Sequence, residues 1–435
     1  GSTFVANRSH NKIHFQLKVL SRVWPPETFP RQPVQAHENM NASLLLHRFF
    51  GLFFLPLYTL LDVACAYPAL CDHKPTMKIT KLQLNSFRNY ASKELEFDAS
   101  KTNILITGEN GKGKTNILEA VYLLSVGKAF RGAHQEDLIQ WGMDYFTVKG
   151  DVQTDDSHPE DLAKFEVGFS TYPRKTKTFR INDVKKNHAE YLGEFVTVLF
   201  HPKDLNMLYL EPSLRRKYLN LLLSQTDKYY FEALSKYTKT LKQRNALLDE
   251  IQEGNHSRND LETWDEKIVE SGTVLIEKRK ELIEYLNGKL QPLYRKISGK
   301  KETLEIKYKT PIQDTGLYLQ KLRLKHDKDI RYGTTSVGPH RDDIKFILEG
   351  KPIEEFASRG EFRTILIALK IAEISYIKLK RKFYPVLLLD DVFSELDENR
   401  QFHLLKAIES CQTIITTTEK PPKPLEEAKT QEVKI

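Results

Sequence analysis

One eight-residue stretch constrains this chain more than any other feature. Residues 108–115 read Gly-Glu-Asn-Gly-Lys-Gly-Lys-Thr and fit the pattern G-x-x-x-x-G-K-[ST]. Glycines let a backbone wrap a phosphate with its N–H groups turned inward. An apolar run at 104–106 precedes the stretch, and helical spacing follows it over 115–125. The sequence therefore predicts a phosphate loop between a buried strand and a helix, whose positive N-terminal end points at the anion.

The loop supplies a first set of candidate nucleotide-binding residues. Lys114 would place a positive charge on the outer phosphates, and Thr115 would offer its hydroxyl to Mg²⁺. The full set is Gly108, Asn110, Gly111, Lys112, Gly113, Lys114, Thr115 and Asn116.

A second apolar run ends in two carboxylates. Residues 386–389 read Val-Leu-Leu-Leu, which predicts a buried parallel strand, and Asp390 and Asp391 follow it. Asp390 is placed to hold Mg²⁺ through water, and Asp391 to orient or activate the attacking water. Alone, such a strand end is weak evidence, because Asp often caps the next helix. With a phosphate loop upstream, it predicts a Mg²⁺-dependent ATP site.

A third candidate group stands at the start of a long helical pattern over 360–383. Ser358 and Gly360 would give this helix an anion-binding N-terminus, although such residues are most often only a cap. Ser358 lies 390 − 358 = 32 residues before Asp390, the spacing at which ABC-type ATPases place their signature motif. In those proteins the signature of one subunit covers the γ-phosphate held by the other. Ser394 and Asp397 resemble their D-loop.

Composition narrows the class of protein. The chain has 435 residues and a net charge of 66 − 58 = +8, which suits a polyanionic partner without proving one. Its three cysteines exclude a disulfide scaffold and a four-cysteine zinc module. There is no run of 18 apolar residues, so a multi-span membrane protein is excluded.

The chain divides into five expected segments. Residues 1–76 contain an apolar run at 49–61 that looks like a signal peptide, but the favoured interpretation is an upstream extension outside the working fold. A turn cluster at 255–260 should break the helical stretch that follows the head into a hairpin. The remaining segments are the first part of the ATPase head at 77–212, a helical lobe at 213–300, the second part of the head at 301–418 and a disordered tail at 419–435.

Further ordered blocks extend across residues 77–418. They include Phe-Arg-Asn-Tyr at 87–90, Arg-Arg-Lys-Tyr-Leu at 215–219, Gln-Arg-Asn-Ala-Leu-Leu at 243–248, Trp-Asp at 264–265 and Gly-Pro-His-Arg-Asp-Asp at 338–343. Together with the phosphate loop and the Asp-Asp and Ser-Glu-Leu-Asp stretches, these blocks make the chain resemble the RecF family of bacterial DNA replication and repair proteins.

The resemblance implies an α/β fold: an ABC-type ATPase head with a mixed sheet and a P-loop, related to SMC proteins, and a compact helical second lobe. It implies ATP and Mg²⁺ as cofactors and a weak, DNA-stimulated ATPase activity. ATP would drive two copies into a homodimer that binds double-stranded and gapped DNA. With RecO and RecR, the dimer would help to load RecA at single-strand gaps and stalled forks, in the cytoplasm and away from membranes. Arg88 and Asn89 would lie beside the nucleotide.

Spacing and departures from the family pattern add two expectations. From Thr115 to Ser358 is 358 − 115 = 243 residues, too few for SMC-type arms and enough for a compact lobe. Glu361 stands where the signature usually has Gln, Lys203 replaces an acidic residue, and Leu210-Glu211 replaces a glycine before Pro212. These departures predict a weaker ATPase or weaker dimerisation.

Several polar groups leave alternatives open. His340, Asp342 and Asp343 suggest a metal site, but a side-chain-capped turn is the favoured interpretation. Arg131 is expected to shape the ATP site or a contact between lobes. Basic residues of the insert could face DNA phosphates or could be merely solvated; they are Arg215, Arg216, Lys217, Lys242 and Arg244.

Two other function classes are weighed. A transporter subunit is disfavoured, because the signature is not Leu-Ser-Gly-Gly-Gln and the late strand at 413–418 has no switch histidine. An ATP-gated nuclease would need an acidic metal cluster outside the ATP site, and the sequence offers no convincing one.

Overall fold

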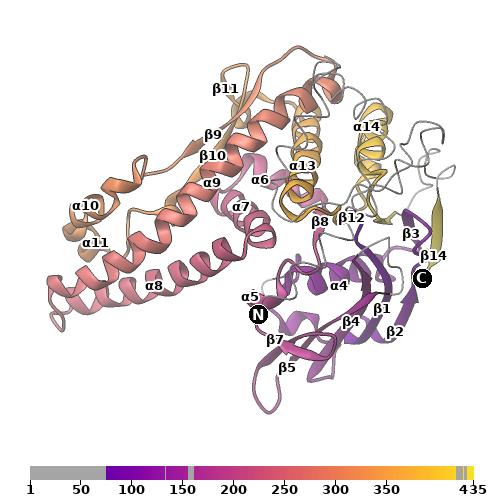
Figure 1. Ribbon diagram of the computed structural model, residues 1–435, viewed down its shortest axis with the longest axis horizontal. Coiled ribbons are helices and arrows are strands. Elements are labelled where there is room, and N and C mark those ends of the chain that lie inside the picture. The colour runs from indigo at the N-terminus through magenta and orange to yellow at the C-terminus, as the bar shows by residue number, and fades with distance from the viewer. Residues whose placement is uncertain (1–74, 133, 155–160, 418–424, 426–428) are drawn as a thin grey trace, which may run out of the picture. The chain divides into compact units, whose positions relative to one another are not determined.

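The structure is a computed structural model that describes residues 75–435 except 133, 155–160, 418–424 and 426–428 (Figure 1). The extension predicted at 1–76 therefore lies outside the described residues, apart from its last two. Thr76 forms a bridge with Tyr384, whose N–H donates to the Pro75 carbonyl at 3.0 Å. The described fold thus begins slightly before Met77, the predicted start.

Alternating apolar and polar residues build an antiparallel sheet. In β1, Ile79, Leu82 and Leu84 are buried, while neighbouring positions face outward. The strand order is β2-β1-β4-β5-β6-β7. The bounds are Lys78–Phe87 for β1, Tyr90–Glu96 for β2, Tyr145–Gln153 for β4, Leu162–Ser170 for β5, Thr176–Ile181 for β6 and Val184–Lys186 for β7, and the short helix α5 follows at His188–Tyr191.

A second sheet is parallel and carries both ATP-site motifs. Its order is β14-β3-β13-β12-β8. The bounds are Asn103–Thr107 for β3, Thr197–Phe200 for β8, Val386–Asp390 for β12, Thr413–Thr416 for β13 and Thr430–Lys434 for β14. Helix α4, at Lys114–Val126, packs between the two sheets and is buried on most of its surface. The predicted α/β fold class is confirmed.

The parallel sheet separates two apolar cores. On β12, Val386 and Leu388 belong to the core around α4. Leu387 and Leu389 point to the opposite face of the sheet and belong to the core that includes the buried residues of α13. Burial on both faces explains why this strand reads as an uninterrupted apolar run.

The prediction of a disordered tail is wrong for the last residues of the chain. Strand β14 pairs in parallel with β3 from Thr430 to Lys434. Val433 and Ile435 pack against the core, and β14 covers an edge of β3 that would otherwise lack a hydrogen-bonding partner. The composition hid this strand because four of its five residues are polar.

The helical lobe follows the predicted hairpin. Its helices are α6 at Leu205–Tyr209, α7 at Pro212–Thr226, α8 at Lys228–Gln252 and α9 at Leu261–Ser298. Figure 1 shows α8 and α9 side by side, joined by a short 3-10 turn at Arg258–Asp260. The break predicted at 255–260 is confirmed. Among the described residues, no helix is long and apolar enough to cross a membrane.

The second part of the ATPase head was predicted to start at residue 301, but the residues that follow still pack on the helical lobe. A three-stranded sheet, β11-β10-β9, packs through β9 on α9 and through β10 on α7. The bounds are Leu304–Lys309 for β9, Asp343–Leu348 for β10 and Lys351–Pro352 for β11, and Tyr318–Arg323, His326–Tyr332 and Ile353–Phe356 for helices α10, α11 and α12. The chain rejoins the parallel sheet only through α13, at Arg359–Arg381; α14 follows at Glu398–Ile408.

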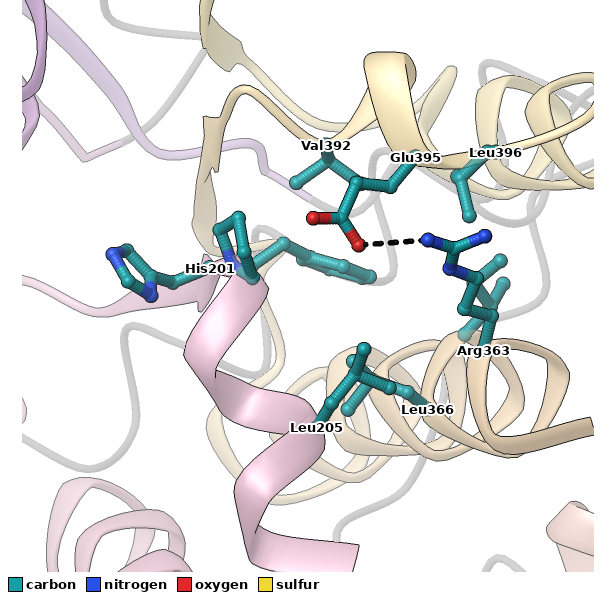
Figure 2. A pocket seen from close by; sticks show the side chains of 10 residues that line it. His201, Leu205, Arg363, Leu366, Val392, Glu395 and Leu396 are labelled. Atoms are coloured by element: carbon teal, nitrogen blue, oxygen red, sulfur yellow. Dashed lines mark hydrogen bonds and ion pairs between the residues drawn. The ribbon is translucent and has the colours of Figure 1, made fainter. Parts of the chain in front are cut away.

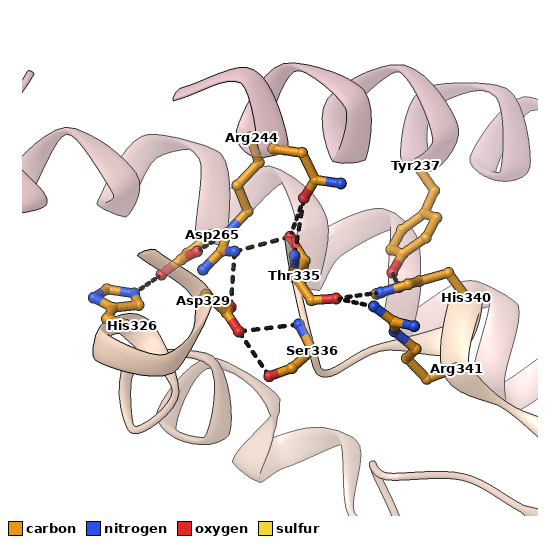
Figure 3. Close-up of polar contacts among 10 residues, drawn as sticks. Tyr237, Arg244, Asp265, His326, Asp329, Thr335, Ser336, His340 and Arg341 are labelled. Carbon is orange, nitrogen blue, oxygen red and sulfur yellow. Dashed lines mark hydrogen bonds and ion pairs between the residues drawn. The ribbon is translucent and has the colours of Figure 1, made fainter. Parts of the chain in front are cut away.

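Two of the five basic residues that could face DNA, Arg215 and Arg244, are buried in ion pairs instead. Arg244 is fully buried and contacts Asp265 at 2.7 Å and Asp329 at 2.9 Å (Figure 3). Arg215 contacts Asp343 at 2.6 Å, and its guanidinium also donates to two backbone carbonyls. These arginines stabilise the lobe and are withdrawn from DNA.

The Gly-Pro-His-Arg-Asp-Asp block is likewise structural. Asp342 is buried and contacts Arg279 at 2.7 Å, and a ring nitrogen of His340 lies 2.6 Å from the Tyr237 hydroxyl. Burial lowers the pKa of His340 to about 4, so the ring is neutral at neutral pH. Within the described ranges there is no cluster of three or more His, Cys, Asp or Glu side chains that could hold a metal ion.

The buried network makes a stability prediction. Arg244→Met leaves two buried carboxylates without their cation, so it should lower the free energy of unfolding by roughly 3 kcal/mol. Arg258→Met is the matched control, because its ion pair with Asp327 is exposed and contributes little. Urea denaturation of both variants measures the difference. Equal stability of the two would contradict a structural role for Arg244.

Candidate functional site

The phosphate loop is shaped by glycines at positions that other residues could not occupy. Gly113 has φ 107°, and a Cβ there would lie 2.7 Å from both the Asn89 side-chain nitrogen and the Tyr90 hydroxyl. Gly113 caps α4, whose first residue is Lys114. The first turn of α4 therefore presents its free N–H groups to the loop interior.

Side-chain hydrogen bonds hold the loop in place. The Lys114 ammonium donates to the carbonyls of Gly108 at 2.6 Å and Glu109 at 3.0 Å, so it lies across the loop. Asn89 donates to the Lys112 carbonyl at 3.0 Å and accepts from Asn116 at 2.8 Å. Asn89, predicted to lie beside the nucleotide, braces the loop from the β1–β2 turn.

The two metal candidates come together at the edge of the parallel sheet. The Thr115 hydroxyl donates to Asp390 Oδ1 at 2.9 Å, and Thr416 donates to the same oxygen at 2.8 Å. Parallel strand ends meet at one edge, which brings residues 275 positions apart in the sequence into contact. Asp390 Oδ2 faces the His201 ring at 3.5 Å. Burial lowers the pKa of His201, so the ring is largely neutral at neutral pH.

Thr115, Asp390 and Thr416 line one open cavity of about 360 Å³ together with residues of the phosphate loop. Asp391 reaches it in a left-handed conformation, φ 52°, with its N–H directed to Thr416. The lining residues are Asn110, Gly111, Gly113, Lys114, Thr115, Asn116, Arg131, Asp390, Asp391, Thr416 and Thr417. The phosphate loop and the Asp-Asp pair, predicted separately, therefore form a single site.

Two arginines near the loop have different surroundings. Arg131 lines the cavity and contacts buried Glu119 at 3.1 Å, in agreement with its expected part in shaping the ATP site. Arg88 contacts Glu119 at 2.8 Å and the Asp137 carbonyl at 2.8 Å. Arg88 is not among the residues that line the cavity, and its guanidinium pairs with Glu119; its expected contact with phosphate stays a prediction.

The signature and D-loop residues form a separate group. Ser358 is the N-cap of α13, and Arg400 donates to the Gly360 carbonyl at 3.0 Å. Arg400 also pairs with Asp397, which caps α14. Ser394 donates to the Asp391 carbonyl at 2.8 Å and so connects this group to the edge of the cavity. Ser358, Gly360, Ser394 and Asp397 do not line the nucleotide cavity of their own chain.

Glu361, the departure in the signature, has defined partners. Its carboxylate accepts from the Ser358 N–H at 2.9 Å in a capping box and contacts Lys300 at 2.8 Å. The hydrogen bond from Lys300, with the Ser358 N–H, lowers the pKa of Glu361, so it is ionised at neutral pH. The negative charge at the signature is therefore partly balanced within the same chain.

The segment after Asp391 packs on the signature helix (Figure 2). Arg363 of α13 points toward Glu395 and contacts it at 3.2 Å. Beside this pair, Val392 and Leu396 face Leu366 across a small apolar pocket of about 30 Å³. The segment 392–396 is therefore in direct contact with α13 through one ion pair and this apolar pocket.

The cavity fits a magnesium nucleotide. Lys114, Arg131 and the N–H groups of α4 supply positive potential for phosphates. The oxygens of Thr115 and Asp390 converge where a hard cation would bridge protein and phosphate, and Mg²⁺ typically takes few protein ligands and completes its shell with phosphate and water.

Sequence reasoning missed several residues of this site. Glu119 lies one helical turn after Thr115, on the same face of α4, and that spacing was available in the sequence. Thr416 and His201 follow or end strands adjacent to β12, which only the sheet order reveals.

Comparisons with known proteins agree with this geometry. Residues 78–431 match the family described as RecF/RecN/SMC N terminal domain. A DNA replication and repair protein RecF from Bacillus cytotoxicus is 38% identical over 353 residues, which cover 79% of this chain and 92% of the relative. The chain belongs to the RecF family. RecF from Agathobacter rectalis is 39% identical over 343 residues, with the same two shares.

Solved RecF structures share the fold. One, described as the recombination mediator protein RecF-ATPrS in the RecFOR pathway, has a TM-score of 0.74 at 35% identity and covers 83% of this chain and 97% of that chain. A RecF-ATP structure from the same pathway has a TM-score of 0.74 at 36% identity, with coverage of 80% and 93%. The resemblance to the RecF family noted in the sequence is confirmed.

Proposed function

We propose that this chain is an ATP-dependent DNA-binding protein that repairs single-strand gaps and stalled replication forks by recombination. The observation that carries the proposal is the single cavity in which Lys114, Thr115 and Asp390 meet. The relatives named above are DNA replication and repair proteins, and two solved relatives are described with ATP or a related nucleotide in the RecFOR pathway.

Each residue has a distinct part in the proposed reaction. Lys114 holds the β- and γ-phosphates, Thr115 and Asp390 hold Mg²⁺, and Asp391 orients the attacking water. When bound, Mg²⁺ neutralises charge that develops on the transferring phosphate. Glu119 keeps Arg131 at the cavity wall, and Thr416 fixes the Asp390 carboxylate. The weak ATP hydrolysis proposed here is stimulated by DNA.

The proposed site is completed by a second copy. Ser358 and Gly360 lie outside the nucleotide cavity of their own chain, at the exposed start of α13. Helix N-termini bind anions, so these residues are suited to a γ-phosphate presented by another molecule. ATP would therefore drive homodimerisation, with Ser394 and Asp397 at the same contact.

The proposal also covers the binding partners of the protein and its location in the cell. The dimer would bind double-stranded and gapped DNA and act with RecO and RecR to load RecA. A protein that uses ATP and chromosomal DNA would work in the cytoplasm, where both are found. The transporter and nuclease alternatives remain weaker, because no observation on the described residues favours either.

Sedimentation tests the proposal directly. The protein should be monomeric alone and dimeric with ATP and Mg²⁺, and the dimer should cosediment with a short gapped duplex. A protein that binds ATP but stays monomeric and leaves DNA free would contradict the proposed function. Cofractionation with membranes would favour the transporter alternative instead.

Glu361→Gln should strengthen dimerisation. Gln can still accept from the Ser358 N–H, so the capping box survives, while a negative charge facing the partner's phosphate is removed. Because Lys300 already balances part of that charge, the ATP concentration for half-maximal dimerisation should fall by only about two- to fivefold. An ATP titration followed by light scattering measures it. Unchanged or weaker dimerisation would show that Glu361 does not limit assembly.

A further inference from the structure

Three basic residues of the lobe differ from their neighbours in their ion pairing. Among the described residues, no carboxylate lies within ion-pair distance of Lys309, Lys328 or Arg341, and all three are exposed. Their neighbours differ: Lys307, on the same strand as Lys309, contacts Glu305 at 2.9 Å, and Lys345 contacts Glu354 at 2.6 Å. The surface around the three residues therefore keeps its positive charge.

These three residues line two adjoining cavities. The first, about 320 Å³, lies between the end of β9 and the loop after it and is lined by Tyr308, Lys309, Thr310, Pro311, Gln313 and Arg341. The second, about 330 Å³, lies at the end of α11 and is lined by Lys328, Tyr332, Thr334, Ser336 and Arg341. Arg341 belongs to both, so one guanidinium joins the two cavities. Neither wall contains a carboxylate.

Two further lysines near the first cavity also favour the binding of an anion there. Lys321 donates to the Pro311 carbonyl at 3.1 Å, and Lys280 donates to the Gln313 carbonyl at 2.8 Å. Two more cations thus stand behind the wall of the first cavity. Three acids that neighbour these cations in the sequence have other partners: Asp342 is buried against Arg279, Asp329 is buried against Arg244, and exposed Asp327 contacts Arg258.

Neutral donors complete the site. The Thr310 hydroxyl accepts from the Ile312 N–H at 3.1 Å and can donate its own hydrogen outward. Thr334 and the Gln313 amide also line the cavities. Figure 3 shows Arg341 beside the Thr335 carbonyl, to which it donates at 3.3 Å; this contact orients the guanidinium between the cavities. Paired cations with hydroxyl and amide donors match successive phosphate groups.

We propose that the two cavities joined by Arg341 are a contact site of the lobe for the phosphate backbone of double-stranded DNA. The proposal rests on the DNA-binding function proposed above and gives that function a surface. The site holds phosphates and reads no bases, so it should bind any sequence equally and weaken steeply with salt. It replaces Arg215 and Arg244, which the sequence suggested for this role.

Salt dependence of duplex binding tests the proposal. The triple variant Lys309→Gln, Lys328→Gln, Arg341→Gln should bind a blunt 30-base-pair duplex more weakly. The slope of log affinity against log salt should become shallower by about 2 to 3, because each lost phosphate contact removes about 0.9. Two duplexes of unrelated sequence should give the same change. Fluorescence anisotropy between 50 and 200 mM salt, with ATP present, measures the slope.

Two comparison variants keep the result interpretable. The first is a triple variant of the head, Lys164→Gln, Arg174→Gln, Lys185→Gln. It removes the same charge from exposed positions and should leave the salt slope of duplex binding unchanged. Arg341→Lys keeps the charge and should retain the slope, which separates electrostatics from a folding defect. Unaltered nucleotide affinity of the Gln triple variant confirms that the head is intact.

The outcomes separate this inference from the function on which it rests. Failure of the unmodified protein to bind any duplex would overturn the proposed function. Normal duplex binding with an identical slope in the lobe triple variant, or equal losses in the head triple variant, would overturn the lobe site alone. A normal slope combined with loss of binding to a protein partner would reassign the surface to that partner.

Discussion

Asp391→Asn should lower ATP turnover by about 10²- to 10⁴-fold and leave ATP-driven dimers intact, trapped in the bound state. Asp391 lines the nucleotide cavity next to Asp390, and its proposed part is to orient and activate water. Asn has the same shape and cannot accept a proton in this way. It also tolerates the left-handed backbone at this position, φ 52°, so the loop should keep its conformation.

A matched control exists in the same chain. Asp183 also has a left-handed backbone, φ 62°, and lies in the turn between β6 and β7, outside the cavity. Asp183→Asn should leave turnover unchanged. Single-turnover phosphate release and sedimentation with ATP would be measured for both variants. Normal turnover in Asp391→Asn would assign water activation to another group, and loss of dimers would point to a role in binding.

Lys114→Met should abolish ATP-driven dimerisation by removing nucleotide affinity. The Lys114 ammonium is nearly buried and lies across the phosphate loop, where its charge has little screening by water. Loss of one partner from a desolvated charge contact costs roughly 2–5 kcal/mol, or about 30- to 5,000-fold in affinity. Equilibrium binding of a fluorescent ATP analogue measures the loss of affinity. Normal dimerisation of the variant would contradict the assignment of residues 108–115 as the nucleotide-binding loop.

Lys112→Met provides the comparison from within the same loop. Lys112 was expected to bind the nucleotide, but its side chain is exposed and its ammonium lies 3.6 Å from Glu109, and it does not line the cavity. Its replacement should change ATP affinity by less than about threefold. Similar losses in both lysine variants would mean that the loop rearranges when it binds phosphate.

The ATP-site motifs could be predicted from the sequence because their signals are local. The spacing of Gly113, Lys114 and Thr115, and the apolar run before Asp390, each lie within a few residues. The sheet order then follows from a general rule, since parallel strands bring their carboxyl ends to one edge. The predicted hairpin at 255–260 was equally local.

Partnerships between distant charged residues could not be predicted. Arg88 and Arg244 look like solvent-facing or phosphate-facing cations in the sequence, because charge alone does not distinguish a solvated side chain from one matched by a buried acid. Glu119 and Asp265, which neutralise them, become neighbours only after the chain has folded. Strand β14 was missed for a related reason: four of its five residues are polar, and its pairing partner β3 lies more than 300 residues earlier.

The placement of β3 has a consequence for synthesis of the protein. Both neighbours of β3 in its sheet, β13 and β14, are made last, and from Thr107 to Thr413 is 413 − 107 = 306 residues. At 5–20 residues per second, translation of that interval takes roughly 15–60 s. Until then the strand that leads into the phosphate loop has the backbone hydrogen-bonding groups of both edges unpaired, while the α8–α9 hairpin, whose contacts are local, can form early. Unpaired strand edges and exposed apolar surface make such an intermediate prone to aggregate until β13 and β14 have been made.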